Sequence, residues 1–199
     1  GLDRWRHHRD VADADRRAIQ TFGEALAGSD RPLVIASGTL GLLPGRVATE
    51  RDWPDSAALP LWPSGPRARM ENAQMTLALA SRGVRSSVLR LPPTVHGDGD
   101  HGFMATIVDI ARDKGVSSYV GEGSNRWPAV HRLDAARLFR LTLEMAPAGT
   151  VLHAVADEGV PIRAVAEVMG RQLGIPVASL SPADASEHFT WLASFLATD

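Results

Sequence analysis

The sequence predicts an α/β fold built on a parallel, doubly wound sheet, followed by a smaller lobe. Short apolar segments typical of buried strands alternate with longer segments whose apolar residues recur every three or four positions. This alternation favours parallel pairing, because each crossover between parallel strands needs a connection about as long as a helix. After residue 98 the elements become shorter and the loops more numerous. We therefore expect residues 1–97 to form most of the sheet, and residues 98–199 to form mostly the lobe, with some elements returning to the sheet.

The first predicted elements are a helix, a strand and a long loop. Apolar residues at steps of three and four predict a helix over residues 10–27. The uninterrupted apolar run 33–36 predicts a short strand that is buried on both faces. Residues 38–65 contain four prolines, four glycines and few periodic apolar positions. We expect a long irregular loop there, and loops of this length in compact domains usually serve function.

A second helix and strand follow this loop. The helix is expected over residues 66–82, with Ser64 as its capping residue. Residues 87–91 predict a strand that must stop at the proline pair 92–93, because proline has no N–H group to donate to a sheet. Residues 94–96 are therefore expected at the carboxyl end of this strand. In open α/β sheets that edge is where ligands bind.

The rest of the chain continues the alternation. Strands are expected at 118–120 and 151–155, and helices at 103–113, from residue 134 and from residue 161. The last of these helices is expected to end at Gly174, because glycine readily takes the left-handed conformation of a helix end.

Composition excludes several classes of function. The 199 residues carry a net charge of −2 and no cysteine, which argues against a nucleic-acid partner, a disulfide framework, thiol catalysis and cysteine-ligated zinc. No apolar run approaches the ~20 residues of a membrane helix, and the basic start of the chain is not followed by the apolar stretch of a signal peptide. We expect a cytoplasmic protein that acts on a small molecule and binds neither nucleic acid nor membrane.

Two tempting motifs lie in the same short loop. Residues 97–102 match the dinucleotide fingerprint G-x-G-x-x-G letter by letter. However, Asp98 and Asp100 would place negative charge where a pyrophosphate must sit, so we interpret the segment as a flexible loop before a helix. His96 and His101 with the two aspartates have no ligand spacing typical of a metal site. A metal site is therefore not expected.

Two other segments carry candidate ligand-binding groups. Ser37 and Thr39 directly follow the first buried strand, and their hydroxyls could bind a carbonyl or hydroxyl group, although simple turn formation is an equal alternative. Arg126 and Trp127 could clamp an anionic or sugar-like ligand between a charged fork and a flat face. The alternative is that Trp127 packs within the lobe. His131 is expected to hold its loop rather than to transfer protons.

Four segments of the chain, taken together, resemble one known family. Residues 33–41 resemble a strand that carries a catalytic Ser/Thr, and residues 88–97 resemble an Arg-Pro-Pro-x-x-Tyr-Gly stretch beside a nicotinamide. Residues 121–134 resemble a segment that borders the substrate, and residues 151–174 resemble a later strand and helix of a substrate lobe. The ordered set resembles the short-chain dehydrogenase/reductase superfamily, in its extended or atypical NAD(P)-dependent epimerase/dehydratase branch.

The resemblance implies a Rossmann-like fold, a cofactor and a set of site residues. The cofactor would be NAD or NADP. The implied cofactor-binding residues are Ser37, Gly38, Arg67, Pro93, Thr94 and Val95. The implied substrate-binding residues are His96, Arg126, Trp127 and His131. The helices 10–27 and 66–82 resemble the pair through which family members dimerise, so we expect a homodimer through them. The alternative is that the apolar stripe at 70–80 serves the core of the chain itself.

The chain departs from the family pattern in two places. Nothing before residue 32 resembles the family's opening strand and glycine-rich loop, so the chain resembles a member that lacks about 70–90 amino-terminal residues. The Tyr-x-x-x-Lys pair is also absent: Pro63 and Arg67 fall near its positions, and the single tyrosine, Tyr119, lies in another segment. Arginine stays charged at neutral pH and cannot itself donate the proton that the family's tyrosine supplies.

Two functions from different classes therefore remain open. The first is an NAD(P)-dependent oxidoreductase or epimerase/dehydratase-like enzyme for a small carbonyl, hydroxyl or sugar-like substrate. Its catalytic residues would be Ser37, Thr39 and His96, with His96 as the proton donor because histidine titrates near neutral pH. The second is a non-catalytic NAD(P)-binding regulator or sensor that has lost the Tyr-Lys chemistry. A third reading is a part that binds nothing by itself.

Overall fold

The computed structural model describes residues 2–40, 42, 46–54 and 66–198. The chain divides into two compact units, of which the first contains residues 1–91 and 133–154 and the second contains residues 92–132 and 155–199. Each unit is built from segments that are separated in the sequence. Among the described residues, no helix is both long enough and apolar enough to cross a membrane.

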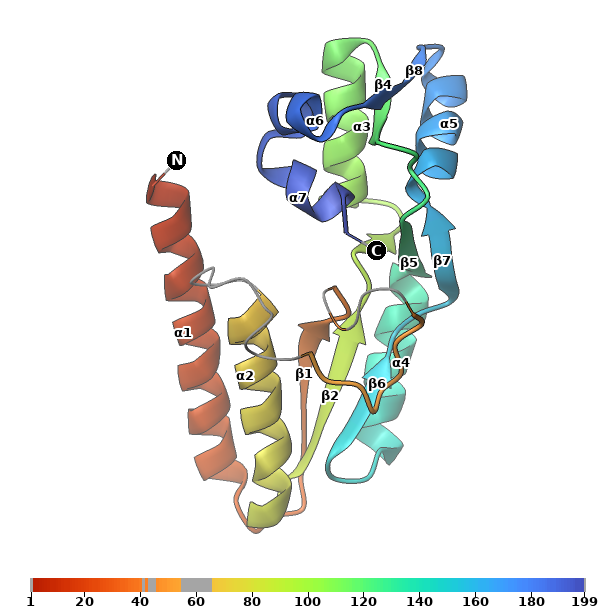
Figure 1. The fold of residues 1–199 in the computed structure, drawn as a ribbon. Coiled ribbons are helices and arrows are strands. Elements are labelled where there is room, and N and C mark those ends of the chain that lie inside the picture. The colour runs from red at the N-terminus through yellow and green to blue at the C-terminus, as the bar shows by residue number, and fades with distance from the viewer. Residues whose placement is uncertain (1, 41, 43–45, 55–65, 199) are drawn as a thin grey trace. The chain divides into compact units, whose positions relative to one another are not determined.

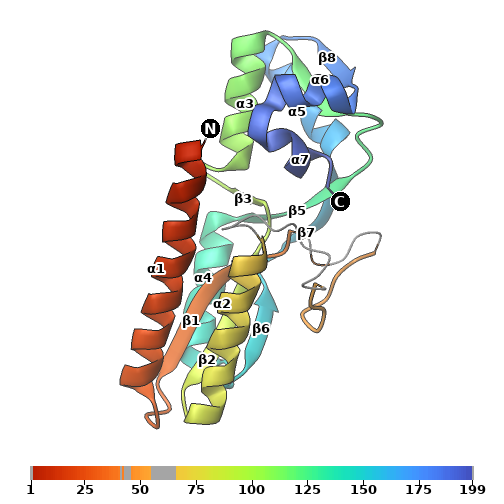
Figure 2. The same ribbon diagram turned by 60° about the vertical axis from the view of Figure 1, so that its left-hand side comes forward.

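The first unit contains a parallel sheet of three strands. The strands are β1 (Pro32–Gly38), β2 (Arg85–Leu91) and β6 (Thr150–His153), in the order β1-β2-β6. The helices are α1 (Leu2–Leu26), α2 (Pro66–Ala78) with the short 3-10 helix η1 (Leu79–Arg82), and α4 (Arg132–Met145). In both views α1 and α2 lie side by side on one side of the sheet and α4 lies behind it (Figure 1, Figure 2). The predicted fold class, a Rossmann-like doubly wound sheet, is confirmed.

The core of the first unit lies between its sheet and the helices α1 and α2. Ile19, Leu79 and Val84 are buried there, and partly buried strand residues such as Leu33 and Ile35 pack against them. The central strand β2 is enclosed along most of its length. Apolar strand residues and periodic helix residues therefore form this core together. The prediction that the run 33–36 is buried on both faces is wrong for the described structure: these residues are partly buried or exposed, because among the described residues β1 pairs only with β2.

The second unit holds two smaller sheets. In one, β3 (Thr94–His96) pairs in parallel with β5 (Arg126–His131), which pairs antiparallel with β7 (Asp157–Pro161). In the other, β4 (Ser117–Val120) pairs in parallel with β8 (Val177–Leu180). The helices are α3 (Phe103–Lys114), α5 (Ile162–Leu173), α6 (Pro182–Phe189), the 3-10 helix η2 (Thr190–Leu192) and α7 (Ala193–Leu196). Side chains from α3, β5, α5, α6, η2 and α7 form its core.

Several expectations need adjustment against these elements. The first helix is longer than residues 10–27, and α4 begins at Arg132, which puts Asp134 inside its first turn rather than at its start. The strands β3, β5, β7 and β8 were not expected, because they are only three to six residues long and depend on partners distant in sequence. The predicted cap Ser64 lies outside the described residues. The roles predicted for residues 1–97 and 98–199 stay predictions.

Candidate functional site

Three polar side chains form a row across the carboxyl ends of the strands in the first unit. Ser37 of β1 stands opposite Arg90 of β2, and Arg90 stands opposite His153 of β6. Residues that face each other in a parallel sheet project from the same side. Ser37 and Arg90 are 6% and 1% exposed, whereas His153 is half-buried. The row therefore places three groups capable of hydrogen bonding at the edge where open α/β sheets bind ligands.

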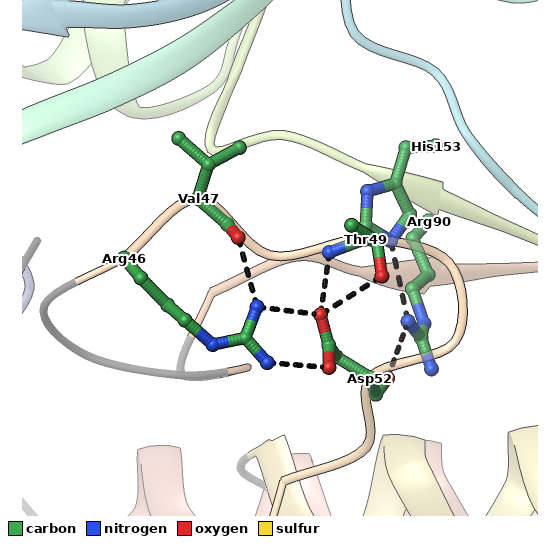
Figure 3. Close-up of polar contacts among 6 residues, drawn as sticks. All are labelled: Arg46, Val47, Thr49, Asp52, Arg90 and His153. Carbon is green, nitrogen blue, oxygen red and sulfur yellow. Dashed lines mark hydrogen bonds and ion pairs between the residues drawn. The ribbon is translucent and has the colours of Figure 1, made fainter.

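Arg90 is the buried centre of this row, and Figure 3 shows it beside His153 and Asp52. Its Nη1 donates a hydrogen bond to the backbone carbonyl of Asp52 at 2.9 Å and lies 3.2 Å from Nε2 of His153. The guanidinium carbon lies 4.4 Å from the centre of the Trp53 ring, a cation–π distance. Nη2 is buried and has no hydrogen-bond partner among the residues that the structure describes. A buried charge is costly unless it is compensated, so these contacts are needed to hold Arg90 in place.

The contact with Arg90 determines the protonation of His153. Arginine carries only donors, so Nε2 of His153 must accept, and the ring proton is therefore assigned to Nδ1. Burial lowers the pKa of His153 below its ordinary value, and the positive charge of Arg90 lowers it further, while the carboxylate of Glu50 opposes both effects. The neutral imidazole is the form that fits this site.

Residues 46–54, called here the 46–54 loop, lie against Arg90 and His153 (Figure 3). Within the loop Arg46 binds Asp52 through two bonds, Nη2 to Oδ1 at 2.6 Å and Nη1 to Oδ2 at 3.1 Å. The backbone N–H and the hydroxyl of Thr49 donate to the same carboxylate at 2.7 and 2.9 Å. These donors, led by Arg46, hold the pKa of Asp52 well below its ordinary value. Asp52 thus fixes the internal shape of the loop.

Glu50 makes a further connection between the loop and the sheet. Its Oε1 accepts a hydrogen bond from the backbone N–H of His153 at 3.3 Å. Hydrogen bonds from its own backbone N–H and from that of His153 lower the pKa of Glu50. The loop therefore contacts β2 through Asp52 and Trp53, and β6 through Glu50.

The predicted residues of the first unit occupy two separate places. Ser37 and Gly38 end β1, and Thr39 follows them with its N–H donating to the Leu91 carbonyl at 3.0 Å and its hydroxyl 3.5 Å from the same oxygen. These three residues thus lie at the carboxyl edge of the sheet, beside Arg90. Arg67 lies in α2, where its Nε is 3.3 Å from the carboxylate of Glu71.

The structure brings two predicted histidines of the second unit together. His96 ends β3 and stands opposite His131 of β5, with ring centroids 5.5 Å apart in an edge-to-face arrangement. The implied cofactor residues Thr94 and Val95 precede His96 on the same strand, and Pro93 comes directly before it. Gly97 follows with a φ of +141°, and a Cβ there would lie 2.9 Å from Nε2 of His131.

Arg126 and Trp127 have different surroundings, although they are adjacent in β5. Trp127 is 2% exposed within the apolar core of the second unit, and its Nε1 donates to the Thr198 carbonyl at 3.2 Å. This placement supports the packing alternative for Trp127. Arg126 is exposed and stands opposite Pro161 of β7. The substrate-binding roles of both residues stay predictions.

The sequence reasoning missed the residues that surround Arg90. Arg90 lies inside the run Val-Leu-Arg-Leu, and a charged residue in a strand buried on both faces needs buried partners. That signal could have singled out Arg90. No comparable signal exists for His153 or Glu50, because they reach Arg90 only through the pairing of β2 with β6 and the path of the 46–54 loop.

Comparisons with known proteins show what the chain is similar to. No family model matches it. It is 47% identical over 193 residues to the uncharacterized protein C2A9.02 of Schizosaccharomyces pombe, covering 96% of this chain and 63% of that protein. It is 41% identical over 187 residues to the uncharacterized protein YLL056C of Saccharomyces cerevisiae, covering 94% of this chain and 60% of that protein. The chain thus spans a little under two thirds of the length of these relatives.

Solved structures with a similar fold include several sugar-nucleotide enzymes. The dTDP-glucose 4,6-dehydratase DesIV from Streptomyces venezuelae, crystallized with NAD bound, has a TM-score of 0.71 and 19% identity, over 91% of this chain and 57% of that one. The NAD-dependent NDP-hexosamine 5,6-dehydratase TunA has a TM-score of 0.69 and 14% identity, over 90% and 59%. MoeE5, in complex with UDP-glucose and NAD, has a TM-score of 0.65 and 22% identity, over 82% and 56%. This chain therefore has the Rossmann-type fold of these proteins, over somewhat more than half of their length.

Proposed function

We propose that the chain forms the larger part of an NAD(P)-dependent oxidoreductase or epimerase/dehydratase-like enzyme for a small carbonyl, hydroxyl or sugar-like substrate. The observation that carries the proposal is the Ser37–Arg90–His153 row at the carboxyl edge of a parallel sheet. The fold supports it, because it is shared with proteins whose structures contain NAD together with UDP-glucose or UDP-glucuronic acid. A sugar nucleotide is accordingly the substrate class to test first.

The edge of β1 that is unpaired among the described residues supports a further strand beside it in the whole protein. Among the described residues β1 pairs only with β2, although its run Leu33–Ala36 has the apolar composition of an internal strand and is only partly buried or exposed. The unpaired N–H and C=O groups of an apolar edge strand readily pair with another strand. We propose that a glycine-rich βαβ half continues the sheet beyond β1 and supplies the phosphate-binding loop that this chain does not contain.

The residues at the carboxyl edge fit a nicotinamide cofactor in part. Ser37 and Gly38 end β1 at that edge, and among the described residues a Cβ on Gly38 would meet only the Leu91 carbonyl oxygen, at 4.0 Å, which leaves this backbone accessible to a ligand as far as the structure describes it. When bound, the nicotinamide would accept or return a hydride. The chain's own residues would do the rest: the hydroxyls of Ser37 and Thr39 would orient the reacting oxygen. The transfer of its proton is the role predicted for His96, which belongs to the second unit.

A non-catalytic NAD(P)-binding protein is the second candidate function. One observation favours it: Arg67, which falls near the position of the family's lysine, is engaged with Glu71, and Glu71 also pairs with Arg16 of α1 at 2.9 Å. A lysine that assists a tyrosine must be directed toward the cofactor, and this arginine is held in a network between two helices instead. A protein of this kind would bind the cofactor without turnover.

A homodimer through α1 and α2 and a cytoplasmic location are also proposals. Val11 and Phe22 of α1 are 48% and 55% exposed, which is more apolar surface than one solvated helix needs. Burial of these side chains against a second copy supports the dimer. Sedimentation velocity of the full-length protein, with Phe22→Glu as the variant, tests it: the variant should be monomeric if this face forms the interface.

Calorimetric titration with NADH and NADPH tests the proposed function. The full-length natural protein, with its mass verified, should bind one of the two cofactors, and the 199-residue chain should bind neither or bind weakly. Conversion of sugar nucleotides by the protein loaded with the oxidised cofactor, with transient reduction of that cofactor as a sugar hydroxyl gives up its hydride, then separates the enzyme from the non-catalytic alternative. If the full-length protein binds neither cofactor, the oxidoreductase proposal is overturned.

A further inference from the structure

In the described part of the chain, the polar contacts and the cation–π contact of the Arg90 guanidinium lead to the 46–54 loop and to β6. Nη1 bonds the Asp52 carbonyl and approaches Nε2 of His153, and the flat guanidinium stacks on Trp53. The bond to Asp52 joins residues 38 positions apart in the chain, and the contact with His153 joins residues 63 apart. One buried side chain therefore links a strand, a second strand and a long loop.

These contacts depend on the shape of arginine as well as on its charge. In the described part of the chain, no carboxylate is within ion-pair distance of Arg90, so its partners are a carbonyl oxygen, an imidazole nitrogen and an aromatic face. A planar guanidinium can meet all three at once. A lysine ammonium is a compact charge without a flat face, and it cannot stack on Trp53 while bonding the other two groups.

We propose that Arg90 is a positioning residue that, together with His153, fixes the 46–54 loop at the carboxyl edge of the sheet, beside Ser37. Arg90 acts through the loop and not on a substrate. The inference about the loop stands on the contacts themselves. Its consequence for turnover rests on the proposed function, because only then does the edge next to Ser37 hold a cofactor and substrate.

The same contacts make the position of the loop dependent on one proton. If Nε2 of His153 gains a proton, two donors and two positive charges face each other across the 3.2 Å that now join Arg90 and His153. The groups that face His153 are Arg90 from β2 and the carboxylates of Glu50 and Asp52 from the loop. The two carboxylates favour the protonated ring. Protonation nevertheless removes the acceptor for Arg90, because Nε2 of His153 then carries a proton. Acidification should therefore release the loop.

Hydrogen–deuterium exchange of the 46–54 backbone tests the positioning role. In Arg90→Lys we expect exchange of this segment to rise by about tenfold or more, since a hydrogen bond to a charged group and the stacking contact are lost. The matched control is Arg85→Lys in the same strand, because Arg85 donates to the Leu143 and Ala146 carbonyls and has no recorded contact with the loop. Unchanged exchange in Arg90→Lys, or an equal rise in both variants, overturns the proposal.

A second variant keeps the test independent of whether Arg90→Lys folds. In His153→Gln the amide oxygen can still accept from Arg90 but cannot be protonated. Between pH 7.5 and 5 the natural chain should lose protection in the 46–54 loop, after correction for the intrinsic exchange rate, and the glutamine variant should keep it. Equal pH dependence in the two proteins refutes the role of His153.

The activity of the full-length protein separates this inference from the proposed function. If both hold, Arg90→Lys lowers kcat/KM, and His153→Gln removes the acidic limb that the loop imposes on the pH profile. If the exchange effects appear but the full-length protein binds neither NADH nor NADPH, the positioning role stands and the proposed function fails. If cofactor binding and turnover occur while exchange of the 46–54 loop is unaffected, the proposed function stands and the positioning role of Arg90 fails.

Discussion

Replacing Trp127 by phenylalanine decides between its two roles, as a core residue or as a wall of the ligand site. The side chain is 2% exposed, lies 5.9 Å from the ring of Phe103, and donates through Nε1 to the Thr198 carbonyl. Phenylalanine keeps one aromatic ring and removes the N–H donor. The Thr198 carbonyl is not left unpaired, since Nδ2 of Asn125 also donates to it at 3.1 Å.

The expected loss has two parts. The missing hydrogen bond contributes about 1 kcal/mol. The smaller ring gives up roughly 40 Å² of buried apolar surface, which at about 25 cal/mol per Å² contributes another ~1 kcal/mol. We expect Trp127→Phe to lower the unfolding free energy of the second unit by about 2 kcal/mol, with little effect on ligand affinity where that unit remains folded.

The assay is urea denaturation at 25 °C followed by far-ultraviolet circular dichroism, with hydrogen exchange to assign the loss to the second unit. Trp191→Phe is the matched control, because Trp191 belongs to the same aromatic group but is 45% exposed. The control should change stability by less than about 0.5 kcal/mol. A Trp127→Phe variant as stable as the control, but with weakened substrate binding, would refute the packing role.

Three further predictions concern the two sets of site residues. Gly97→Ala should lower the melting temperature clearly more than Gly99→Ala. Both positions have positive φ, but among the described residues only the new Cβ at Gly97 would meet a neighbour, Nε2 of His131 at 2.9 Å; equal losses would contradict this. The unfolding free energy of the natural chain should decrease as the pH falls below about 6.5, because burial lowers the pKa of His153 in the folded state and the unfolded chain therefore binds that proton more tightly. The urea midpoint, measured from pH 8 to 5, should fall less below pH 6.5 in His153→Gln than in the natural chain. Ser37→Ala in the full-length protein should lower kcat roughly 10²-fold without changing the melting temperature, if the hydroxyl orients the reacting oxygen; unchanged turnover would exclude that role.

The sequence predicted those parts of the fold that depend on local pattern. The apolar run 33–36 and the mostly apolar residues 87–91 were recognisable as strands because each is a short segment bounded by turn or proline signals, although only β2 is enclosed along most of its length and residues 33–36 of β1 are partly buried or exposed. The short strands of the second unit carry no such pattern. β3 has only three residues, and it is a strand because β5 lies beside it. Whether these residues form a strand depends on tertiary contacts, and the pattern of a single sequence does not show such contacts.

In the candidate site, too, local pattern was predictable and tertiary contacts were not. Ser37 could be placed at a ligand-binding edge because its strand visibly ends there. The partnership of Arg90 with His153 could not be predicted, since it depends on the register between β2 and β6 and on a loop that closes from residues 46–54. A charged residue within an apolar strand indicates that partners exist, but it does not say which ones.

The proline pair between the two units explains how one short segment serves both. β2 pairs with β1 up to Leu91, whose carbonyl also accepts from the N–H of Thr39. Pro92 and Pro93 have no N–H groups, so the ladder of β2 cannot extend through them. The next strand, β3, is thereby free of the register of β2, and it pairs with β5 instead. Arg90 therefore ends in the polar row of the first unit, and His96, six positions later, lies beside His131 in the second. An uninterrupted strand of ordinary residues would have been held to the β2 register, so we infer that the two prolines allow this segment to contribute to both sets of predicted site residues.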